Sequence, residues 1–511
     1  MTAVSTSASS PDTQHKRTVR LIFAALMLVM LLASLSQTVL STALPTIVGS
    51  LAGAEHLAWV MTAYLLAMTI TMPIYGRIGD RFGRKPVLLV AIAVFTIGSL
   101  VGAVADSMTV LIAGRAIQGL GGGGLMVLSQ AAIADVVPAR ERGKYMGILG
   151  AVFAVSSVAG PLLGGWFTEG PGWRWTFWIN VPLGVMAFAA VAYLLHIPRI
   201  AAGPKARIDY LGMTLLAVAT TAVILAATWG GHQYDWNSVQ ILSLGVVAVV
   251  STIVFVLIER RADEPVIPMA LFADRNFVLT TVGSLVMGVA MFGSLSYLPT
   301  YMQMSVGVDA THAGLMMVPM MGGLLITSIV VGQRVSKTGR YRWYPVSGAA
   351  VMGVGLWLLS LLKVGASTWQ IEGSLLVLGI GIGLGMQVMT LIVQNSFSHK
   401  IVGTATAATN FFRQVGGTLG AAAVGSVFTA RLVENLTANL PESKGQVSSS
   451  SLTPDALAAV PEQVREIIVT AYNEALMPIF LWLVPLALVS VVALAFVREK
   501  PLAVTIESKE N

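Results

Sequence analysis

Long runs of apolar residues alternate with short polar segments along almost the whole 511-residue chain. A helix that crosses the hydrocarbon core of a bilayer needs about 20 apolar residues. Fourteen runs free of Asp, Glu, Lys and Arg have about this length, and they cover residues 21–54, 56–76, 86–105, 116–134, 145–168, 175–198, 210–234, 236–258, 276–308, 310–333, 343–362, 373–399, 401–430 (interrupted by Arg413) and 475–497. The pattern predicts an all-α polytopic membrane protein with 14 transmembrane helices.

Basic residues lie just before the first run and inside the fourth span. Lys16, Arg17 and Arg20 precede the first run, as they would in a signal peptide, but the run is too long for a signal sequence. We therefore expect a span there, preceded by a disordered Ser/Thr-rich tail over residues 1–15. The fourth span is expected to begin near Met108 and to contain Arg115.

Composition excludes several classes of protein. Hydrophobic residues make up 55% of the chain and charged residues 11%, whereas soluble domains have about 25% charged residues. The excess of positive charge is scattered along the chain, so we expect no nucleic-acid partner. The chain has no cysteine, which excludes disulfides, thiolate metal sites, cysteine nucleophiles and lipidated cysteines.

Basic residues are divided unevenly between alternate loops. The loops on the side of the two termini contain most of the 31 lysines and arginines, whereas the opposite loops contain only Arg174, Lys363, Arg431, Lys444 and Arg465. Since basic loops remain on the cytoplasmic side of a membrane, both termini are expected in the cytoplasm. We expect a monomer in the plasma (inner) membrane, with the lipid bilayer as its surroundings.

One loop on the external side is long, over residues 431–474. Apolar residues recur in it at steps of three and four, namely Leu457, Val460, Val464, Ile467 and Ala471. This spacing favours a helix that lies on the membrane surface, and a disordered linker is the alternative.

A short motif occurs twice. Residues 76–84 read GRIGDRFGR between the second and third spans, and residues 332–340 read GQRVSKTGR between the tenth and eleventh. Both glycines and the final arginine coincide, while Ser336 replaces Asp80. Because transporters often contain duplicated halves, we predict a 6+2+6 arrangement. The predicted parts are a tail at 1–20, a six-helix bundle at 21–198, two extra helices with linkers at 199–275, a second bundle at 276–497 and a tail at 498–511.

Five segments together resemble a known family. They are GRIGDRFGRK at 76–85, LIAGRAIQGLGGG at 111–123, GPLLGG at 160–165, WRWTFWINVP at 173–182 and LSQTVLSTALPT at 35–46. Together they resemble the major facilitator superfamily, and within it the fourteen-span drug:proton antiporters of the EmrB/QacA type. The resemblance covers roughly residues 20–430 and the last span, and it implies the major facilitator fold and transport driven by a proton gradient, without a cofactor.

The resemblance implies that the 76–85 loop is a gate that latches the cytoplasmic side. Its expected gating residues are Gly76, Asp80, Arg81, Gly83, Arg84 and Lys85. Glycines permit a tight turn, Asp80 would pair with a donor on a facing helix, and the basic residues would hold the rim. Anchoring of basic residues at the membrane is the alternative, but it leaves Asp80 unexplained.

Three residues are candidates for proton coupling: Arg115, Asp135 and Glu372. An unpaired arginine in the middle of a span costs about 2.5–3.5 kcal/mol, so Arg115 should face a partner or a wet cavity. The resemblance implies a coupling role for it, whereas a snorkelling arginine is the alternative. Asp135 would bind a proton or cap its helix.

Span five carries the segment that resembles the antiporter motif, with Gly160, Pro161, Gly164 and Gly165. The glycines remove side-chain volume at a four-residue step, and Pro161 bends the helix. The resemblance implies a hinge and seal between the two halves, and plain helix packing is the alternative.

Polar residues inside otherwise apolar spans are candidates for a substrate cavity. They are Gln37, Tyr64, Gln118, Tyr297, Tyr301, Gln387, Gln394, Asn410 and Arg413. Hydrogen bonds between helices, at about 0.6 kcal/mol each, would explain the same residues.

The leading hypothesis is a proton-coupled exporter of drug-like or amphipathic molecules, and an exporter of one metabolite, antibiotic or lipid on the same fold is the alternative. Ser36 stands where many relatives of this type have an acid, which weakens the case for dicationic substrates. An enzyme is not expected, because the six histidines show no metal-ligand spacing and no nucleophile has an adjacent base. We expect no metal.

Overall fold

The computed structural model describes residues 11–51, 56–196, 209–231, 233–439 and 460–504. Fourteen helical segments in this part are long and apolar enough to cross a membrane, which confirms the predicted number. The described residues form no named strand, and a single isolated bridge joins Gly230 to Tyr234.

The helices follow one another with short connections. Their bounds are α1 Pro11–Leu51, α2 Leu57–Phe82, α3 Arg84–Ala103, α4 Met108–Val136, α5 Ala139–Glu169, α6 Trp175–Trp178, α7 Asn180–Leu194, α8 Tyr210–Trp229, α9 Val239–Glu259, η2 Met269–Ala273, α10 Arg275–Leu295, α11 Leu298–Tyr301, η3 Met302–Val306, α12 Ala310–Met316, α13 Val318–Thr338, α14 Trp343–Ser360, α15 Thr368–Ser396, α16 Val402–Asn439 and α18 Glu462–Ala495.

Polar residues mark where several spans begin. The side chains of Ser107, Asp209, Ser238 and Asp274 each accept a backbone N–H from the first turn of the helix that follows. The first N–H groups of a helix have no partner within it, so a preceding Ser or Asp stabilises the start.

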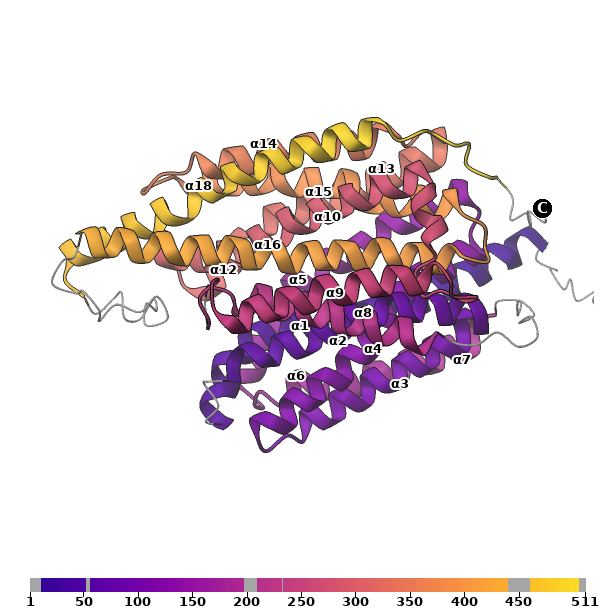
Figure 1. Cartoon of the computed structure of the whole chain (residues 1–511), viewed down its shortest axis with the longest axis horizontal. Helices are drawn as coiled ribbons and strands as arrows, with labels where there is room; N and C mark the ends of the chain where they lie inside the picture. Colours follow the sequence, from indigo (N-terminus) through magenta and orange to yellow (C-terminus); the bar gives the residue numbers. More distant parts are fainter. Residues whose placement is uncertain (1–10, 52–55, 197–208, 232, 440–459, 505–511) are drawn as a thin grey trace, which may run out of the picture.

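The spans pack into two groups. One apolar core joins α1–α5 with α7, and another joins α10, α13–α16 and α18; we call these groups the N half and the C half. In Figure 1 the N half is indigo to purple, the C half runs from pink through orange to yellow, and α8 and α9 lie in front between them. The helix α1 begins and α18 ends on the same side, at the right of Figure 1. We call this side the terminal face.

The connection expected at residues 76–85 is almost entirely helical. Helix α2 continues to Phe82 and α3 begins at Arg84, so Gly83 alone separates them. Its φ of 91° lies in the region that only glycine adopts readily. The prediction of a loop was therefore wrong for residues 76–82, and Asp80 and Arg81 are presented by a helix.

The long loop predicted over residues 431–474 is shorter than expected. Helix α16 continues to Asn439, and α18 begins at Glu462. The separate surface helix is wrong as well, because Val464, Ile467 and Ala471 belong to α18 and Ala471 is buried. Leu457 lies outside the described residues. The apolar face packs on the protein instead of a membrane surface.

Three smaller boundaries also differ. Helix α1 begins at Pro11, inside the predicted disordered tail, while its candidate membrane span begins at Thr18, and residues 1–10 lie outside the described part. Span nine is broken at residues 296–297 and ends in the π-helical turn η3. The predicted C-terminal tail contacts the C half at residues 498–501.

Candidate functional site at the junction of the two halves

Asp80 lies at the terminal-face end of α2 and caps α16, a helix of the other half. Its Oδ1 accepts the backbone N–H of Gly403 at 3.0 Å, and its Oδ2 accepts the N–H and the hydroxyl of Thr404, each at 2.5 Å. The side chain is almost fully buried. A carboxylate is a strong partner for these N–H groups because a helix N-terminus carries partial positive charge. The N half therefore supplies the cap of a C-half helix.

A glycine lets these two helices approach. A Cβ atom added at Gly76 would lie 2.3 Å from the Cβ of Ala407 and 2.9 Å from the carbonyl oxygen of Gly403. No side chain fits in that space, so Gly76 sets the distance at which Asp80 reaches α16.

Arg84 joins two carboxylates behind this cap. Its guanidinium forms an ion pair with Asp80, and its Nε lies 3.0 Å from Oδ2 of Asp135. His399 approaches the other oxygen of Asp135, at 3.6 Å. Arg84 is 2% exposed, so these charges interact with little screening by water.

The structure separates two of the predicted proton-coupling residues. Asp135 belongs to the network around Asp80, whereas Arg115 lies 20 residues earlier on the same helix, or about 30 Å along its axis. The two therefore cannot form a pair.

A second junction joins α5 to α13 with the opposite chemistry. Arg140, in the first turn of α5, donates to the carbonyl oxygens of Ser336 at 3.3 Å and Lys337 at 3.1 Å. These carbonyls lie in the last turn of α13, where a helix carries partial negative charge. The two copies of the repeated motif therefore make different contacts. In the first copy, Asp80 caps the N-terminus of α16. In the second copy, the C-terminus of α13 is capped by Arg140 of α5.

Small residues bring α5 and α13 together along this junction. A Cβ atom added at Gly147 would lie 2.4 Å from the carbonyl oxygen of Ser328, and one at Gly143 would lie 2.9 Å from that of Gly332. Next to this contact, Gln387 of α15 helps to line a void of about 10 Å³, which is room for about one water molecule.

Amide side chains form a deeper layer of the junction. Gln130 of α4 accepts from two helices of the C half: its backbone carbonyl takes the Nε2 of Gln394 at 3.2 Å, and its Oε1 takes the Nδ2 of Asn410 at 2.8 Å. Asn410 in turn accepts from Arg413, one turn further along α16. Three predicted cavity residues are therefore brought together as a seal between the halves.

Arg142 closes the end of α4. Its guanidinium donates to the carbonyl oxygens of Ala134 at 2.5 Å and Val137 at 2.9 Å, and to that of Gln394 at 3.4 Å. A buried cation at a helix C-terminus stabilises carbonyls that have no partner within the helix.

Arg115 lies inside the N half, away from the junction. It donates to the carbonyl of Val60 at 3.2 Å and to Oε1 of Gln118 at 2.5 Å, and it lies 4.1 Å from the ring centroid of Tyr64. Gln118 donates onward to Ser36 at 2.9 Å and Ser99 at 2.7 Å. No carboxylate is among these partners, so amide, hydroxyl, carbonyl and ring groups surround the charge.

This network includes two residues that were predicted to line the substrate cavity. Tyr64 and Gln118 have no exposed surface, because both are used to hold Arg115 within the N half. The Nη2 of Arg115 and the hydroxyl of Tyr64 are buried without a hydrogen-bond partner.

The glycines of span five pack against α1, which belongs to the same half. A Cβ atom added at Gly160 would lie 2.1 Å from the Oγ1 of Thr38, and one at Gly164 would lie 1.9 Å from that of Thr42. Gly165 has nothing within 4 Å, and Pro161 lies inside a continuous helix. The expected seal between the halves is therefore not formed by these residues in this structure.

The remaining predicted residues are dispersed. Gln37 and Tyr297 are half-buried, and Tyr297 lies 5.9 Å from the ring of Phe428. Tyr301 is buried and its hydroxyl accepts from Asn473 at 2.9 Å, so it serves packing within the C half.

Glu372 and the predicted gating residues lie at opposite ends of the molecule. Glu372 is half-buried near the start of α15, far along that helix from the terminal face. At the terminal face, Arg81 lies 3.1 Å from Glu264 and Arg77 pairs with the same carboxylate. Lys85, which is close to Arg81 in the sequence, is half-buried.

Several residues of the junction were not predicted from the sequence, namely Gln130, Arg140, Arg142, Gly143, Gly147, Glu264, Ser328, Gly332, Gly403 and Thr404. The four-residue step between Gly143 and Gly147 is typical of close helix contacts, so this pair could have been found. The partners on α16 could not, because nothing local in their sequence indicates a carboxylate from the other half.

Comparisons with known proteins agree with this architecture. The family model described as Major Facilitator Superfamily matches residues 26–421. An uncharacterized MFS-type transporter of Mycobacterium tuberculosis (strain ATCC 25618 / H37Rv) is 42% identical over 94% of this chain and 70% of its own length. The multidrug transporter protein MdtP of Bacillus subtilis (strain 168) is 35% identical over 92% of this chain and 90% of its own.

Two further matches extend the comparison. Multidrug resistance protein 3 of Bacillus subtilis (strain 168) is 31% identical over 94% of this chain and 96% of its own. The crystal structure of the human organic anion transporter MFSD10 (TETRAN) aligns with a TM-score of 0.64 at 15% identity, covering 93% of this chain and 99% of that one. At that identity the likeness concerns the fold alone.

Proposed function

Because this chain belongs to the major facilitator superfamily, we propose that it exports drug-like or amphipathic molecules across the plasma membrane in exchange for protons. In this proposal the two halves rock about a central substrate site, which opens alternately to each side. The proton gradient supplies the energy.

The observation that carries the proposal is the position of the contacts between the halves. They join the terminal-face ends of α2 and α13 to the terminal-face ends of α16 and α5, through Asp80 and Arg140. Such contacts must break for the halves to part on this side. They therefore support a gate that is closed on the terminal face and alternates with an open state.

The distribution of basic residues supports the orientation that this proposal requires. The terminal face carries most lysines and arginines of the loops, which supports its placement in the cytoplasm. A cytoplasmic gate that is closed corresponds to a state open to the outside, from which an exporter releases its substrate and takes up a proton.

The substrate class rests on the relatives. Two bacterial relatives that match along almost their whole length are named for multidrug transport or resistance. A broad range of drug-like molecules is therefore the favoured cargo.

Asp135 is the residue that we assign to the coupling proton at the gate. It shares Arg84 with Asp80, so the charge on Asp135 affects how Arg84 holds the cap of α16. Protonation removes one of the two negative charges beside Arg84, weakens the closed gate and favours opening to the cytoplasm. Arg115 and Glu372 remain candidates for steps at the substrate site and the outer entrance.

Transport in proteoliposomes tests the proposal. An imposed pH gradient should drive accumulation of a fluorescent drug-like substrate by the full-length protein, and collapse of the gradient should abolish it. Asp135→Asn should lose the response to the gradient, whereas Asp106→Asn, which changes an exposed carboxylate, should retain it. Substrate movement that is indifferent to the gradient would refute proton coupling.

A further inference from the structure

A groove lies between the two extra helices and the C half. It has a volume of about 480 Å³ and lies between α8, α9 and α16, with residues before α10 closing one side. Its walls include Leu216 and Val223 of α8, Phe255 of α9, Phe272 of η2, and Phe412 and Val415 of α16. The groove is thus built by the pair of helices that a 6+6 transporter lacks.

The groove is mostly apolar, with two threonines along its length and a cation at one end. Apart from Thr220, Thr252 and Arg260, its lining side chains are hydrocarbon, aromatic or methionine. The hydroxyl of Thr252 donates to the carbonyl of Ala248 at 2.7 Å, whereas the hydroxyl of Thr220 is buried without a hydrogen-bond partner. An apolar channel with a cation at its mouth matches a molecule with a long apolar chain and an anionic head.

Arg260 is free to bind such a head. It directly follows the last residue of α9 at the terminal face, where lipid headgroups meet the protein, and its side chain is exposed. Two neighbouring carboxylates are engaged elsewhere: Glu259 accepts the backbone N–H groups of Val266 and Ile267, and Glu264 pairs with arginines of α2. Asp263 is exposed on the same connection.

The depth of the groove also fits an acyl chain. Val223 lies 13 residues along α8 from its terminal-face end, which corresponds to about 20 Å. A bilayer core is about 30 Å thick, so one leaflet is about half of that. A chain that enters beside Arg260 can therefore run the full depth of its leaflet inside the groove.

We propose that this groove binds an anionic phospholipid, with one acyl chain between α8, α9 and α16 and the phosphate on Arg260. The lipid would contact Phe411 and Phe412, which flank Asn410 and Arg413 of the seal on the same helix. The extra helices would then hold a lipid against a gate helix.

Photo-crosslinking tests this site without depending on transport. The full-length protein is reconstituted with phosphatidylglycerol or phosphatidylcholine that carries a photoreactive acyl chain, and labelled peptides are identified by mass spectrometry. Phosphatidylglycerol should label α8 and α16 about fivefold more than phosphatidylcholine, the preference expected for one basic residue near a lipid headgroup. Arg260→Gln should remove this preference, whereas Arg261→Gln, the adjacent exposed arginine, should keep it.

A second variant makes the result decisive. Ala219→Trp fills the groove and should remove labelling of its walls by both lipids. Equal labelling by the two lipids in the unmodified protein, or an unchanged preference in Arg260→Gln, would overturn the proposal.

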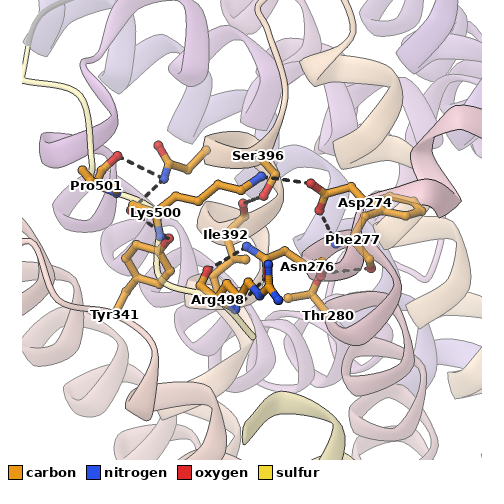
Figure 2. Close-up of polar contacts among 11 residues, drawn as sticks. Asp274, Asn276, Phe277, Thr280, Tyr341, Ile392, Ser396, Arg498, Lys500 and Pro501 are labelled. Carbon is orange, nitrogen blue, oxygen red and sulfur yellow. Dashed lines mark hydrogen bonds and ion pairs between the residues drawn. The ribbon is translucent and has the colours of Figure 1, made fainter. Parts of the chain in front are cut away.

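The chain that follows α18 forms a second set of contacts, which is separate from the groove. Residues 498–503, which we call the C-terminal strap, follow α18 at the terminal face, and Figure 2 shows the contacts of Arg498, Lys500 and Pro501. Asn276 at the start of α10 exchanges two hydrogen bonds of 2.8 Å with the backbone of Arg498. The Nζ of Lys500 lies 2.9 Å from Asp274.

The strap is also tied to the link between α13 and α14. The Tyr341 hydroxyl donates to the carbonyl of Lys500 at 2.9 Å and accepts its N–H at 2.7 Å, and the backbone N–H of Tyr341 donates to Glu499 at 2.6 Å. Burial raises the pKa of the Tyr341 hydroxyl, so it remains a donor. Residues 498–501 of the strap are therefore fixed to the C half.

Its far end crosses to the N half. The backbone N–H of Arg140, in the first turn of α5, donates to the carbonyl of Ala503 at 3.0 Å. In α16 the corresponding N–H groups are capped by Asp80. Ser336 offers no carboxylate to α5, and the strap supplies a carbonyl oxygen instead.

We infer that the C-terminal strap fastens the two halves on the terminal face and so favours the closed gate. Removal of residues 502–511 keeps the contacts of residues 498–501 with the C half and deletes the carbonyl that caps α5. Removal of residues 505–511 is the matched control, because it spares Ala503.

Distance measurement between spin labels tests this inference. The chain has no cysteine, so Lys144→Cys on α5 and Thr338→Cys on α13, both exposed, can be labelled selectively. The ratio of separated to closed populations should rise about fivefold in the longer truncation, as expected for the loss of one hydrogen bond, and should not change in the shorter one. Identical distance distributions in the two truncations would overturn the inference.

Discussion

The carboxylate of Asp80 accepts the backbone N–H of Thr404 at 2.5 Å and thereby caps a helix that belongs to the other half of the molecule. A cap between halves differs from an ordinary helix cap, because it is lost whenever the halves part. The stability of α16 and the state of the gate are therefore linked through one side chain.

Asp80→Asn should weaken the closed gate. The amide has no charge to offer Arg84 and only one acceptor oxygen for the N–H groups of Gly403 and Thr404, and a hydrogen bond to a charged group contributes about 1.5–3 kcal/mol. The separated population of the spin-label pair at positions 144 and 338 should rise by about tenfold or more. Asp80→Glu, which keeps the charge, should lie between the mutant and the unmodified protein.

Ser336→Asp should act in the opposite sense. It places a carboxylate at the position that matches Asp80 in the repeated motif, next to the first turn of α5 and to Arg140. The added charge should stabilise the closed gate and slow transport. A transport rate equal to that of the unmodified protein, with an unchanged distance distribution, would show that the two junctions are not equivalent.

The glycines of α5 should differ sharply in their tolerance of substitution. A Cβ atom at Gly147 would lie 2.4 Å from the backbone of α13, whereas Gly165 has nothing within 4 Å. Gly147→Ala should force the halves apart and reduce transport severalfold at normal expression, while Gly165→Ala should transport normally. Gly160→Ala, which strikes α1 of the same half, should instead lower the melting temperature.

Arg115→Met should destabilise the N half and stop proton-driven transport. The substitution removes hydrogen bonds to Val60 and Gln118 and the contact with the Tyr64 ring, and it leaves a buried amide without its partner, at a cost of about 1–3 kcal/mol. Thermal unfolding and transport should be measured together. Lys363→Met, which removes an exposed basic residue, is the control.

Much of the fold could be predicted because membrane-spanning helices can be recognised in a sequence by their length and apolar composition. The connections between the helices were harder to predict. A one-residue link at Gly83 depends on a positive φ that hydropathy does not reveal, and the extension of α16 to Asn439 beyond its apolar run follows from packing against α18.

The site was predicted only in part, since partners lie far apart in the sequence. Asp80 was expected to meet a donor on a facing helix, but the donor is a pair of backbone N–H groups more than 300 residues away, which no side-chain pattern marks. Gly160 and Gly164 were given a place between the halves, yet their neighbours are on α1. Glycines spaced four residues apart predict a close helix contact, but the sequence does not say which helix lies opposite them.

The exchange of substrate for protons is tested most directly by reversing the driving force. Proteoliposomes that contain a pH-sensitive dye, with no pH gradient and with the membrane potential clamped, are given an outward or inward gradient of a transported drug-like substrate. The account predicts proton flow opposite to the substrate in both cases, and its loss in Asp135→Asn. Substrate flux without proton flow, or with protons moving in the same direction as the substrate, would contradict it.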